Sequence, residues 1–133
     1  MISVWIVDDD EEMSHAVGLM LRLMQLDVHS YRDARTAARK MLAGHRPDLM
    51  VLDINMPGVS GIDLLEFIRS RPEFQQLPIV MLSSETTDVQ VEEAIRLGAD
   101  AFVFKPVTMD ELKSALKKAV AAHPRQISRR RRS

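Results

Sequence analysis

The sequence predicts an α/β fold, a doubly wound (βα)5 three-layer sandwich whose five parallel strands lie in the order 2-1-3-4-5. Short apolar runs of strand length alternate with longer stretches whose apolar residues recur every three or four positions, which is the pattern of repeated strand and helix units. The chain has 133 residues, enough for one domain and too few for a second full one. Right-handed crossovers between parallel strands favour this strand order.

The first two strand and helix pairs can be placed from their apolar spacing and their ends. An apolar strand over residues 2–7 precedes a helix over about 11–25, in which methionine is frequent at helical spacing. Filling of the core explains these methionines better than an adaptable surface does. A weaker strand over 27–31 leads to a helix that Asp33 caps and Gly44 ends, because Asp accepts from the first helical turn and glycine adopts the left-handed conformation at a helix end.

Three further pairs complete the pattern. The predicted strands are the apolar runs 48–54, 78–83 and 101–104. The predicted helices are 61–70, 87–97 and the segment between Thr108 and Pro124. Gly98 follows the fourth helix at the position where a left-handed residue ends a helix. The last helix begins with the capping-box spacing of Thr108 and Glu111.

Charge is distributed unevenly along the chain. The 18 Lys and Arg and 19 Asp and Glu residues give a net charge of −1. Residues 1–121 alone carry −6, because five arginines lie in the last twelve residues. These arginines are Arg125, Arg129, Arg130, Arg131 and Arg132. We therefore expect an acidic domain over 1–123 and a flexible basic tail over 124–133.

Composition excludes several classes of protein. The absence of cysteine removes disulfide frameworks, thiol nucleophiles and thiolate metal sites, and agrees with a reducing compartment. No apolar run approaches the ~18 residues of a membrane span, and the N-terminus lacks the basic segment of a signal peptide. We expect a cytoplasmic protein with no membrane partner.

Acidic residues follow two strands that are neighbours in the predicted sheet. Asp8, Asp9 and Asp10 come directly after the first strand, and Asp53 ends the third. The winding direction reverses between these strands, and ligands bind at that point outside the carboxyl ends of the strands. Clustered carboxylates repel one another unless a cation neutralises them, and oxygen ligands without His or Cys select a hard ion such as Mg²⁺. For Asp10, Glu11 and Glu12, a helix cap or a solvated surface position is an equally good explanation.

A hydroxyl and an ammonium group are expected at the same edge of the sheet. Ser83 ends the fourth strand and Lys105 follows the fifth. Beside a metal-bound carboxylate, these two groups form a site for a phosphoryl group, because Lys supplies positive charge and Ser a hydrogen bond. The alternative is that Lys105 only balances the acidic residues, which does not explain why all these groups follow successive strands.

Four segments carry these groups. They are IVDDD at 6–10, LDINMPGVSG at 52–61, PIVMLSS at 78–84 and FVFKP at 102–106. In this order and spacing they closely resemble the receiver domains of bacterial two-component response regulators, and of chemotaxis receivers in particular. The resemblance covers residues 2–121 and implies a flavodoxin-like fold.

The resemblance implies a phosphoacceptor with a metal pocket. Asp53 would accept the phosphoryl group. Asp8, Asp9 and Asp53 would hold Mg²⁺, with the backbone carbonyl of Asn55 as a further ligand. Asn55 and Glu85 would flank the water that later hydrolyses the acyl phosphate, giving slow self-dephosphorylation within seconds to minutes.

The resemblance also implies a switch at the neighbouring strands. Lys105 would pair with the phosphoryl group, and its bond to Pro106 would be cis. The Ser83 hydroxyl would move toward the phosphoryl group while Phe102 turns inward. Many relatives have Tyr in place of Phe102, so plain core packing is the competing interpretation of this residue. The output face would be the fourth helix, the fifth strand and the fifth helix.

The implied function is a phosphorylation-activated signalling switch rather than an enzyme. A sensor histidine kinase or a phosphotransfer protein would donate the phosphoryl group, and an unidentified protein target would recognise the phosphorylated monomer or a phosphorylation-dependent dimer. Nucleic acid would bind only through the arginines at 129–132, by non-specific electrostatics. A short solvated extension explains these arginines better.

Competing classes lack residues that they require. A pseudo-receiver, which works without phosphate, usually lacks the acceptor, one of the acidic pair or the lysine, and all are present here. A haloacid-dehalogenase-type phosphatase needs a second acid where this chain has Asn55. The acidic run after the first strand would repel the cofactor phosphate of a flavodoxin-like electron carrier, and no P-loop motif occurs. The histidines, which are His15, His29, His45 and His123, show no ligand spacing and are expected at the surface or in packing.

Overall fold

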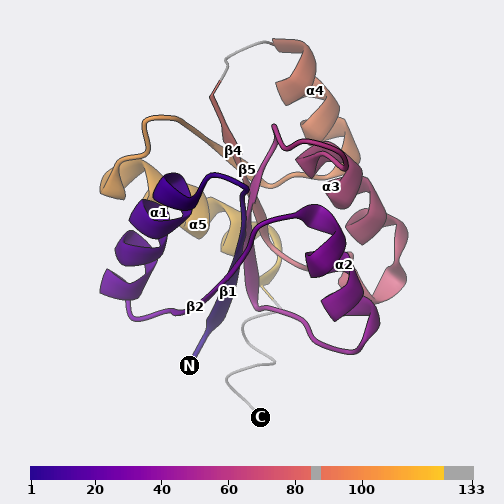
Figure 1. Ribbon diagram of the computed structural model, residues 1–133, viewed down its shortest axis with the longest axis horizontal. Helices are drawn as coiled ribbons and strands as arrows, with labels where there is room; N and C mark the ends of the chain where they lie inside the picture. Colours follow the sequence, from indigo (N-terminus) through magenta and orange to yellow (C-terminus); the bar gives the residue numbers. More distant parts are fainter. Residues whose placement is uncertain (85–87, 125–133) are drawn as a thin grey trace.

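The computed structural model describes residues 1–84 and 88–124, which form a five-stranded parallel sheet (Figure 1). Its strand order is β2-β1-β3-β4-β5, as the sequence predicts. The strands are β1 (Ser3–Val7), β2 (Asp27–Tyr31), β3 (Leu49–Asp53), β4 (Ile79–Ser83) and β5 (Ala101–Phe104). Each strand ends within one residue of its predicted bounds.

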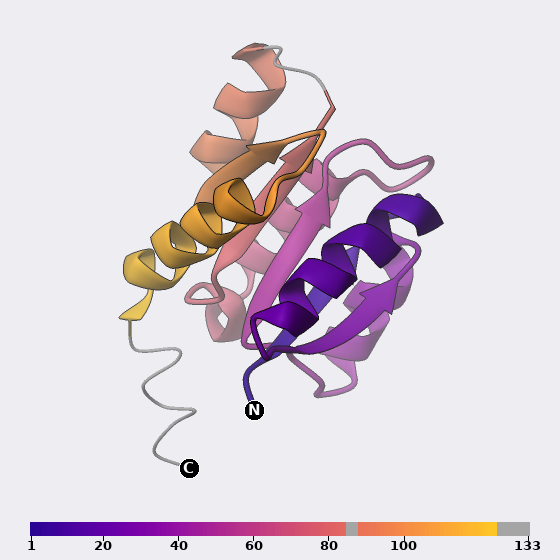
Figure 2. The same cartoon turned by 90° about the vertical axis from the view of Figure 1, so that its left-hand side faces the viewer.

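Helices cover both faces of the sheet. They are α1 (Glu11–Leu23), α2 (Ala34–Leu42), α3 (Gly61–Ser70), α4 (Asp88–Leu97) and α5 (Met109–Ala122). α1 and α5 lie on one face, and α2, α3 and α4 lie on the other (Figures 1 and 2). A short 3₁₀ helix, Pro72–Phe74, was not predicted. The predicted helix start at residue 87, Glu85 and the arginine tail lie outside the described residues.

Alternation along the strands divides the core into two layers. In β1, Val4 and Ile6 pack against α1 and α5, whereas Trp5 and Val7 face α2 and α3. The strands β3 and β4 are buried at every position, which explains their continuous apolar runs. The edge strand β2 is mostly exposed, which explains why its apolar pattern in the sequence is weaker.

Side-chain caps fix where the helices begin. Asp33 accepts from the Thr36 N–H at 2.7 Å, as predicted. Thr108 accepts from the Glu111 N–H at 3.2 Å, which is one of the two bonds of the predicted capping box. A full capping box starts α3, where Ser60 accepts from the Asp63 N–H and the Asp63 carboxylate accepts from the Ser60 N–H. These bonds satisfy N–H groups that have no partner inside the helix.

One glycine brings α3 close to the end of β3. A Cβ atom on Gly61 would lie 1.9 Å from the backbone oxygen of Asp53. The Gly61 N–H also donates to the Ile54 carbonyl at 3.0 Å. The close approach of these two backbone segments is what requires glycine at this position. It holds the loop after Asp53 against the start of α3.

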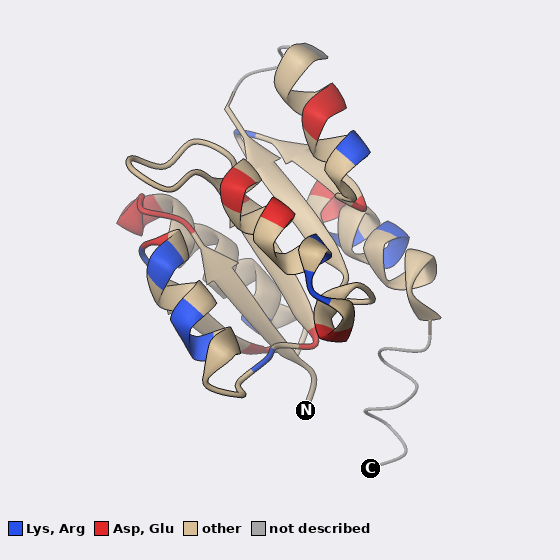
Figure 3. Cartoon of the chain, turned by 90° about the vertical axis from the view of Figure 1, so that its right-hand side faces the viewer, with Lys and Arg blue, Asp and Glu red and all other residues tan. Residues whose placement is uncertain are grey.

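Two helices on the same face of the sheet, α2 and α3, differ in charge. α2 carries Arg35, Arg39 and Lys40 and no acidic residue, as Figure 3 shows beside the acidic residues of α3. Within the described residues, no helix is long and apolar enough to span a membrane.

Candidate functional site

The carboxyl ends of the strands bring the predicted site residues to one edge of the sheet. Asp8 directly follows β1 and Asp53 ends β3, and these two strands are paired. One carboxylate oxygen from each of Asp8, Asp9 and Asp53 lies within 4.8 Å of the others. Residues that are more than forty positions apart in the chain therefore form one acidic cluster. Asp8 and Asp53 are buried, whereas Asp9 is exposed.

Asp8 is the least satisfied member of this cluster. Its side chain accepts one hydrogen bond through Oδ1, from the Asp10 N–H at 3.0 Å. Its Oδ2 is buried and has no hydrogen-bond partner among the described residues. Burial raises the pKa of Asp8 from 3.8 to about 6, and repulsion by Asp53 adds to this effect. A buried carboxylate with an unused oxygen is a poor structural element but a good ligand for a cation.

Lys105 supplies the positive charge of the site. Its Nζ donates to Asp53 Oδ1 at 3.2 Å and lies 3.9 Å from Asp8 Oδ2. The bond between Lys105 and Pro106 is cis, as the resemblance implies. The Lys105 N–H also donates to the Ser83 carbonyl at 2.8 Å, so the ends of β4 and β5 are joined directly beside the cluster. Ser83 is fully buried at this edge.

The consecutive aspartates after β1 differ in their surroundings. The Asp10 side chain accepts from the Met13 N–H at 3.1 Å and caps α1. This contact confirms the capping alternative for Asp10. Asp8 and Asp9 share the acidic cluster with Asp53. Three carboxylates, one with an unused buried oxygen and none accompanied by His or Cys, fit a hard divalent cation such as Mg²⁺.

The remaining predicted residues surround the cluster. Asn55 is exposed on the loop after β3. Phe102 is half-buried on β5 and stacks against Phe104, with the ring centroids 6.5 Å apart. Gly58 adopts a left-handed φ of 76° in the turn that leads to α3. Glu85 lies outside the described part of the chain.

The sequence did not reveal a cavity beside the site. It has a volume of about 540 Å³ and lies between the loop after β3 and α4. Asn55, Pro57 and Ser60 line one side, and Gln90 and Glu93 of α4 line another. No motif in the sequence could have predicted it, because its two walls come from segments that only the packing of α4 brings together.

A second feature that the sequence did not reveal is a polar network at the opposite edge of the sheet. Asp100 bonds to Arg69 of α3 at 3.0 Å and to His123 at 2.8 Å. His123 was expected at the surface or in packing, whereas the structure places it in this network with a mostly buried side chain. The spacing of these residues carries no signal, since each comes from a different element.

Comparison with known proteins agrees with this geometry. The family model described as "Response regulator receiver domain" matches residues 4–117. The chemotaxis protein CheY of Pseudomonas aeruginosa is 34% identical over 117 residues, which cover 88% of this chain and 94% of the relative. CheY-3 of Vibrio cholerae is 36% identical over 117 residues, which cover 88% of this chain and 90% of the relative. The phosphate regulon transcriptional regulatory protein PhoB of Rhizobium meliloti is 34% identical, but only 49% of its length is matched.

Solved structures agree on the fold. The chemotaxis protein CheY4 of Vibrio cholerae superimposes with a TM-score of 0.81 at 28% identity, covering 90% of this chain and 98% of that one. The bacteriophytochrome response regulator RtBRR gives a TM-score of 0.80 at 25% identity, and the superposition covers 90% of this chain and 78% of that one. The fold, the acidic cluster and these matches together show that the chain belongs to the receiver domain family of two-component response regulators.

Proposed function

We propose that Asp53 accepts a phosphoryl group from a histidine kinase or a phosphotransfer protein, and that the modified domain signals to a protein target. The observation that supports this most strongly is the convergence of Asp53, the under-satisfied Asp8 and Lys105 at one edge of the sheet. A buried acidic cluster of this kind destabilises the fold unless it has a ligand to bind. Phosphoryl transfer supplies such ligands, a cation and a phosphate.

The transfer is a nucleophilic substitution at phosphorus. The Asp53 carboxylate attacks the phosphorus of a phosphohistidine, the bond from phosphorus to the imidazole nitrogen breaks, and a mixed carboxylic-phosphoric anhydride forms. Lys105, at 3.2 Å from Asp53 Oδ1, is positioned to stabilise the negative charge on the phosphoryl oxygens. The imidazole leaves with the electron pair of the broken bond and takes up a proton from solvent.

Asp8, Asp9 and Asp53 would hold Mg²⁺, with the backbone carbonyl of Asn55 as a further ligand. The ion would screen the repulsion between the carboxylates and the incoming phosphoryl group and neutralise charge that develops on it. The unused Asp8 Oδ2 is the atom that most needs such a partner. The domain is consumed once per transfer, so it is a regulatory phosphoacceptor rather than an enzyme. Water would hydrolyse the anhydride slowly, with Asn55 and Glu85, which lies outside the described residues, as the residues expected to tune the rate.

The output face comprises α4, β5 and α5. Phosphorylation adds negative charge and three strong acceptors beside Ser83, whose hydroxyl turns toward them. Phe102 is half-buried, so it can move inward as Ser83 moves. The protein target would recognise this change on β5. We expect the domain to extend over residues 1–123 and to act in the cytoplasm.

Incubation with acetyl phosphate and Mg²⁺ tests the proposal. We expect the intact mass of the wild type to increase by one phosphoryl group, and the increase to be lost on addition of EDTA and in Asp53→Asn. Asp10→Asn is a matched control, because this residue caps α1 and should leave phosphorylation nearly unchanged. A wild type that gains no mass, or an Asp53→Asn variant that gains it equally, contradicts the proposal.

A further inference from the structure

An apolar groove lies between α1 and α5, at the end of the sheet opposite the acidic cluster. It has a volume of about 610 Å³, and Met24, Leu26, Leu116 and Val120 form much of its lining. Ile2, just before β1, and Leu49, the first residue of β3, also line it. The acidic cluster is at the other end of these strands, on the order of 15 Å away. We call this feature the α1/α5 groove.

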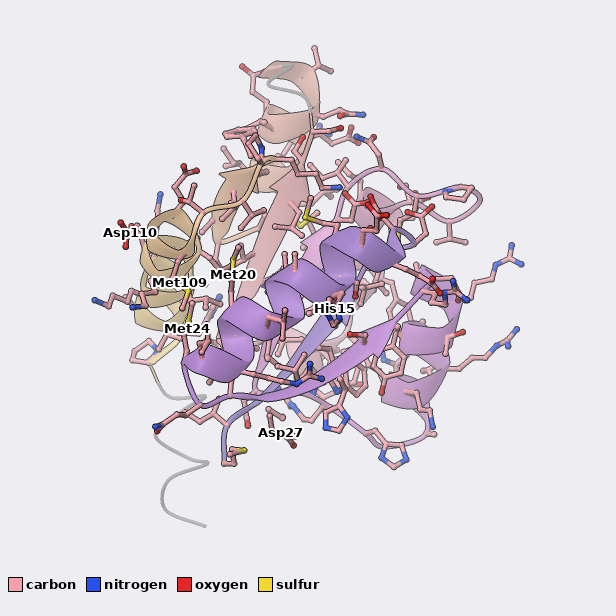
Figure 4. The ribbon with its side chains drawn as sticks, turned by 60° about the vertical axis from the view of Figure 1, so that its left-hand side comes forward. His15, Met20, Met24, Asp27, Met109 and Asp110 are labelled. Carbon is pink, nitrogen blue, oxygen red and sulfur yellow. The ribbon has the colours of Figure 1, made fainter. Side chains whose placement is uncertain are left out.

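The groove leaves apolar surface in contact with solvent. Met24, Leu26 and Val120 are only partly buried, and Leu23, next to Met24 on α1, is 75% exposed. In Figure 4, Met20 and Met24 lie on the side of α1 that faces α5. A soluble chain rarely leaves a contiguous apolar groove uncovered, and methionine side chains adapt to varied partners. Core filling explains the buried methionines of the chain but not an open groove.

The charged residues that line the groove are positive, although residues 1–121 together carry −6. Lys113 and Lys117, one turn apart on α5, are part of its lining, which contains no acidic residue. Asp27 directly follows Leu26 and is not part of the lining, so the positive charge of the groove is that of Lys113 and Lys117 on its α5 side. An occupant that carries negative charge would be complementary to this rim.

We propose that the α1/α5 groove binds an amphipathic helix of a partner protein, with apolar residues in the groove and Asp or Glu beside the lysines. A third helix can pack its apolar ridge into the groove between two helices. Two lysines spaced one turn apart can pair with acids spaced one turn apart on that helix. The site is separate from Asp53 and does not depend on phosphorylation.

Two other occupants fit the charge less well. A second copy of the chain, related by a two-fold axis, would bring its own Lys113 and Lys117 toward the same rim. The basic tail carries five arginines and would be repelled by the same lysines. The rim therefore favours an acidic partner over either part of this chain.

A labelled synthetic helix of 18 residues, with leucines on one face and glutamates elsewhere, is a direct probe. We expect it to bind, by fluorescence anisotropy, and to bind at least tenfold more tightly than the same peptide with lysines in place of the glutamates. In a protein with ¹³C-labelled methionine methyl groups, the signal of Met24 should shift and that of the buried Met56 should not. Equal binding of both peptides, or an unmoved Met24 signal, overturns the proposal.

Two neighbouring lysines provide matched variants. Lys117 lines the groove, whereas the equally exposed Lys118 does not. We expect Lys117→Glu to weaken binding of the glutamate peptide about tenfold and Lys118→Glu less than twofold. Equal losses in both variants contradict the proposal. A Met24 signal that shifts with protein concentration alone also contradicts it, because this result would identify a second copy of the chain as the occupant. Asp53→Asn should bind the peptide as the wild type does, so a failure of phosphorylation would not affect this test.

Discussion

Two aspartates at opposite ends of the sheet have mostly buried side chains but contrasting surroundings. Asp100, just before β5, uses both oxygens: Oδ2 accepts from Arg69 at 3.0 Å and from the Ile79 N–H at 2.8 Å, and Oδ1 bonds to His123 at 2.8 Å. Asp8, just after β1, accepts one hydrogen bond, and its Oδ2 has no hydrogen-bond partner among the described residues and lies 3.9 Å from Lys105 Nζ. Both carboxylates are close to a basic side chain, but only Asp100 is fully satisfied.

We interpret Asp100 as part of a structural site and Asp8 as part of the candidate functional site. Arg69 also donates to the carbonyls of Gly98 and Phe74, so the network around Asp100 ties α3 to the segment before β4 and to the loop after α4. Complete satisfaction of this kind stabilises a fold and leaves no atom for a ligand. Asp8 instead carries a free-energy cost that a bound cation can remove. Buried polar groups with missing partners are therefore more informative about function than buried ion pairs.

We expect the largest effect on stability at Asp100, whose carboxylate oxygens both have hydrogen-bond partners. Asp100→Ala leaves the mostly buried guanidinium of Arg69 without its carboxylate, and we expect a loss of about 3–5 kcal/mol of unfolding free energy. Equilibrium urea denaturation measures it. Asp110→Ala, at an exposed position in the first turn of α5, is the control and should change stability by less than about 1 kcal/mol. A loss of less than about 1 kcal/mol in Asp100→Ala would contradict the interpretation of Asp100 as a structural residue.

At the acidic cluster, replacing an aspartate should raise the free energy of unfolding rather than lower it. Asp8→Asn removes a buried charge and its repulsion with Asp53, so we expect the variant to be more stable than the wild type by about 1–3 kcal/mol in Mg²⁺-free buffer at pH 7. The same change should abolish the stabilisation that Mg²⁺ gives the wild type. Thermal or urea unfolding with and without Mg²⁺ measures both. Lower stability of Asp8→Asn without the metal would show that this carboxylate is structural.

The raised pKa of Asp8 predicts a pH dependence of stability. The native state binds the Asp8 proton up to about pH 6, and the unfolded chain releases it near 3.8. Stability without Mg²⁺ should therefore fall as pH rises through this window and level off above it. Relative to Asp8→Asn, the wild type should gain about 1 kcal/mol on going from pH 7 to pH 5. A constant difference between the two proteins would contradict the prediction.

The smallest effect is expected at the edge of the structural network. His123→Ala removes one partner of Asp100 but leaves Arg69 and the Ile79 N–H in place, so we expect a loss of about 1 kcal/mol. His15→Ala, on the exposed side of α1, is the matched control and should have little effect. Equal changes in the two variants would show that His123 contributes nothing through Asp100.

Much of the candidate site was predictable because its residues are tied to strand ends. Asp8, Asp53, Ser83 and Lys105 each follow or end an apolar run, and parallel strands bring their carboxyl ends to one edge. The N-caps at Asp33 and Thr108 were predictable for a similar reason, since a cap depends on residues within one helical turn. The reciprocal capping box at Ser60 is equally local but was not predicted.

The sequence alone determined the strand order, the two-layer core and the identity of the acidic cluster, because apolar periodicity and strand-end chemistry are properties of short segments. The tertiary structure alone decided which aspartate is satisfied. Asp8 and Asp100 have similar sequence surroundings, each beside an apolar strand, but their partners come from other elements of the fold. The α1/α5 groove has the same origin, since a groove between two helices exists only once both are packed on the sheet.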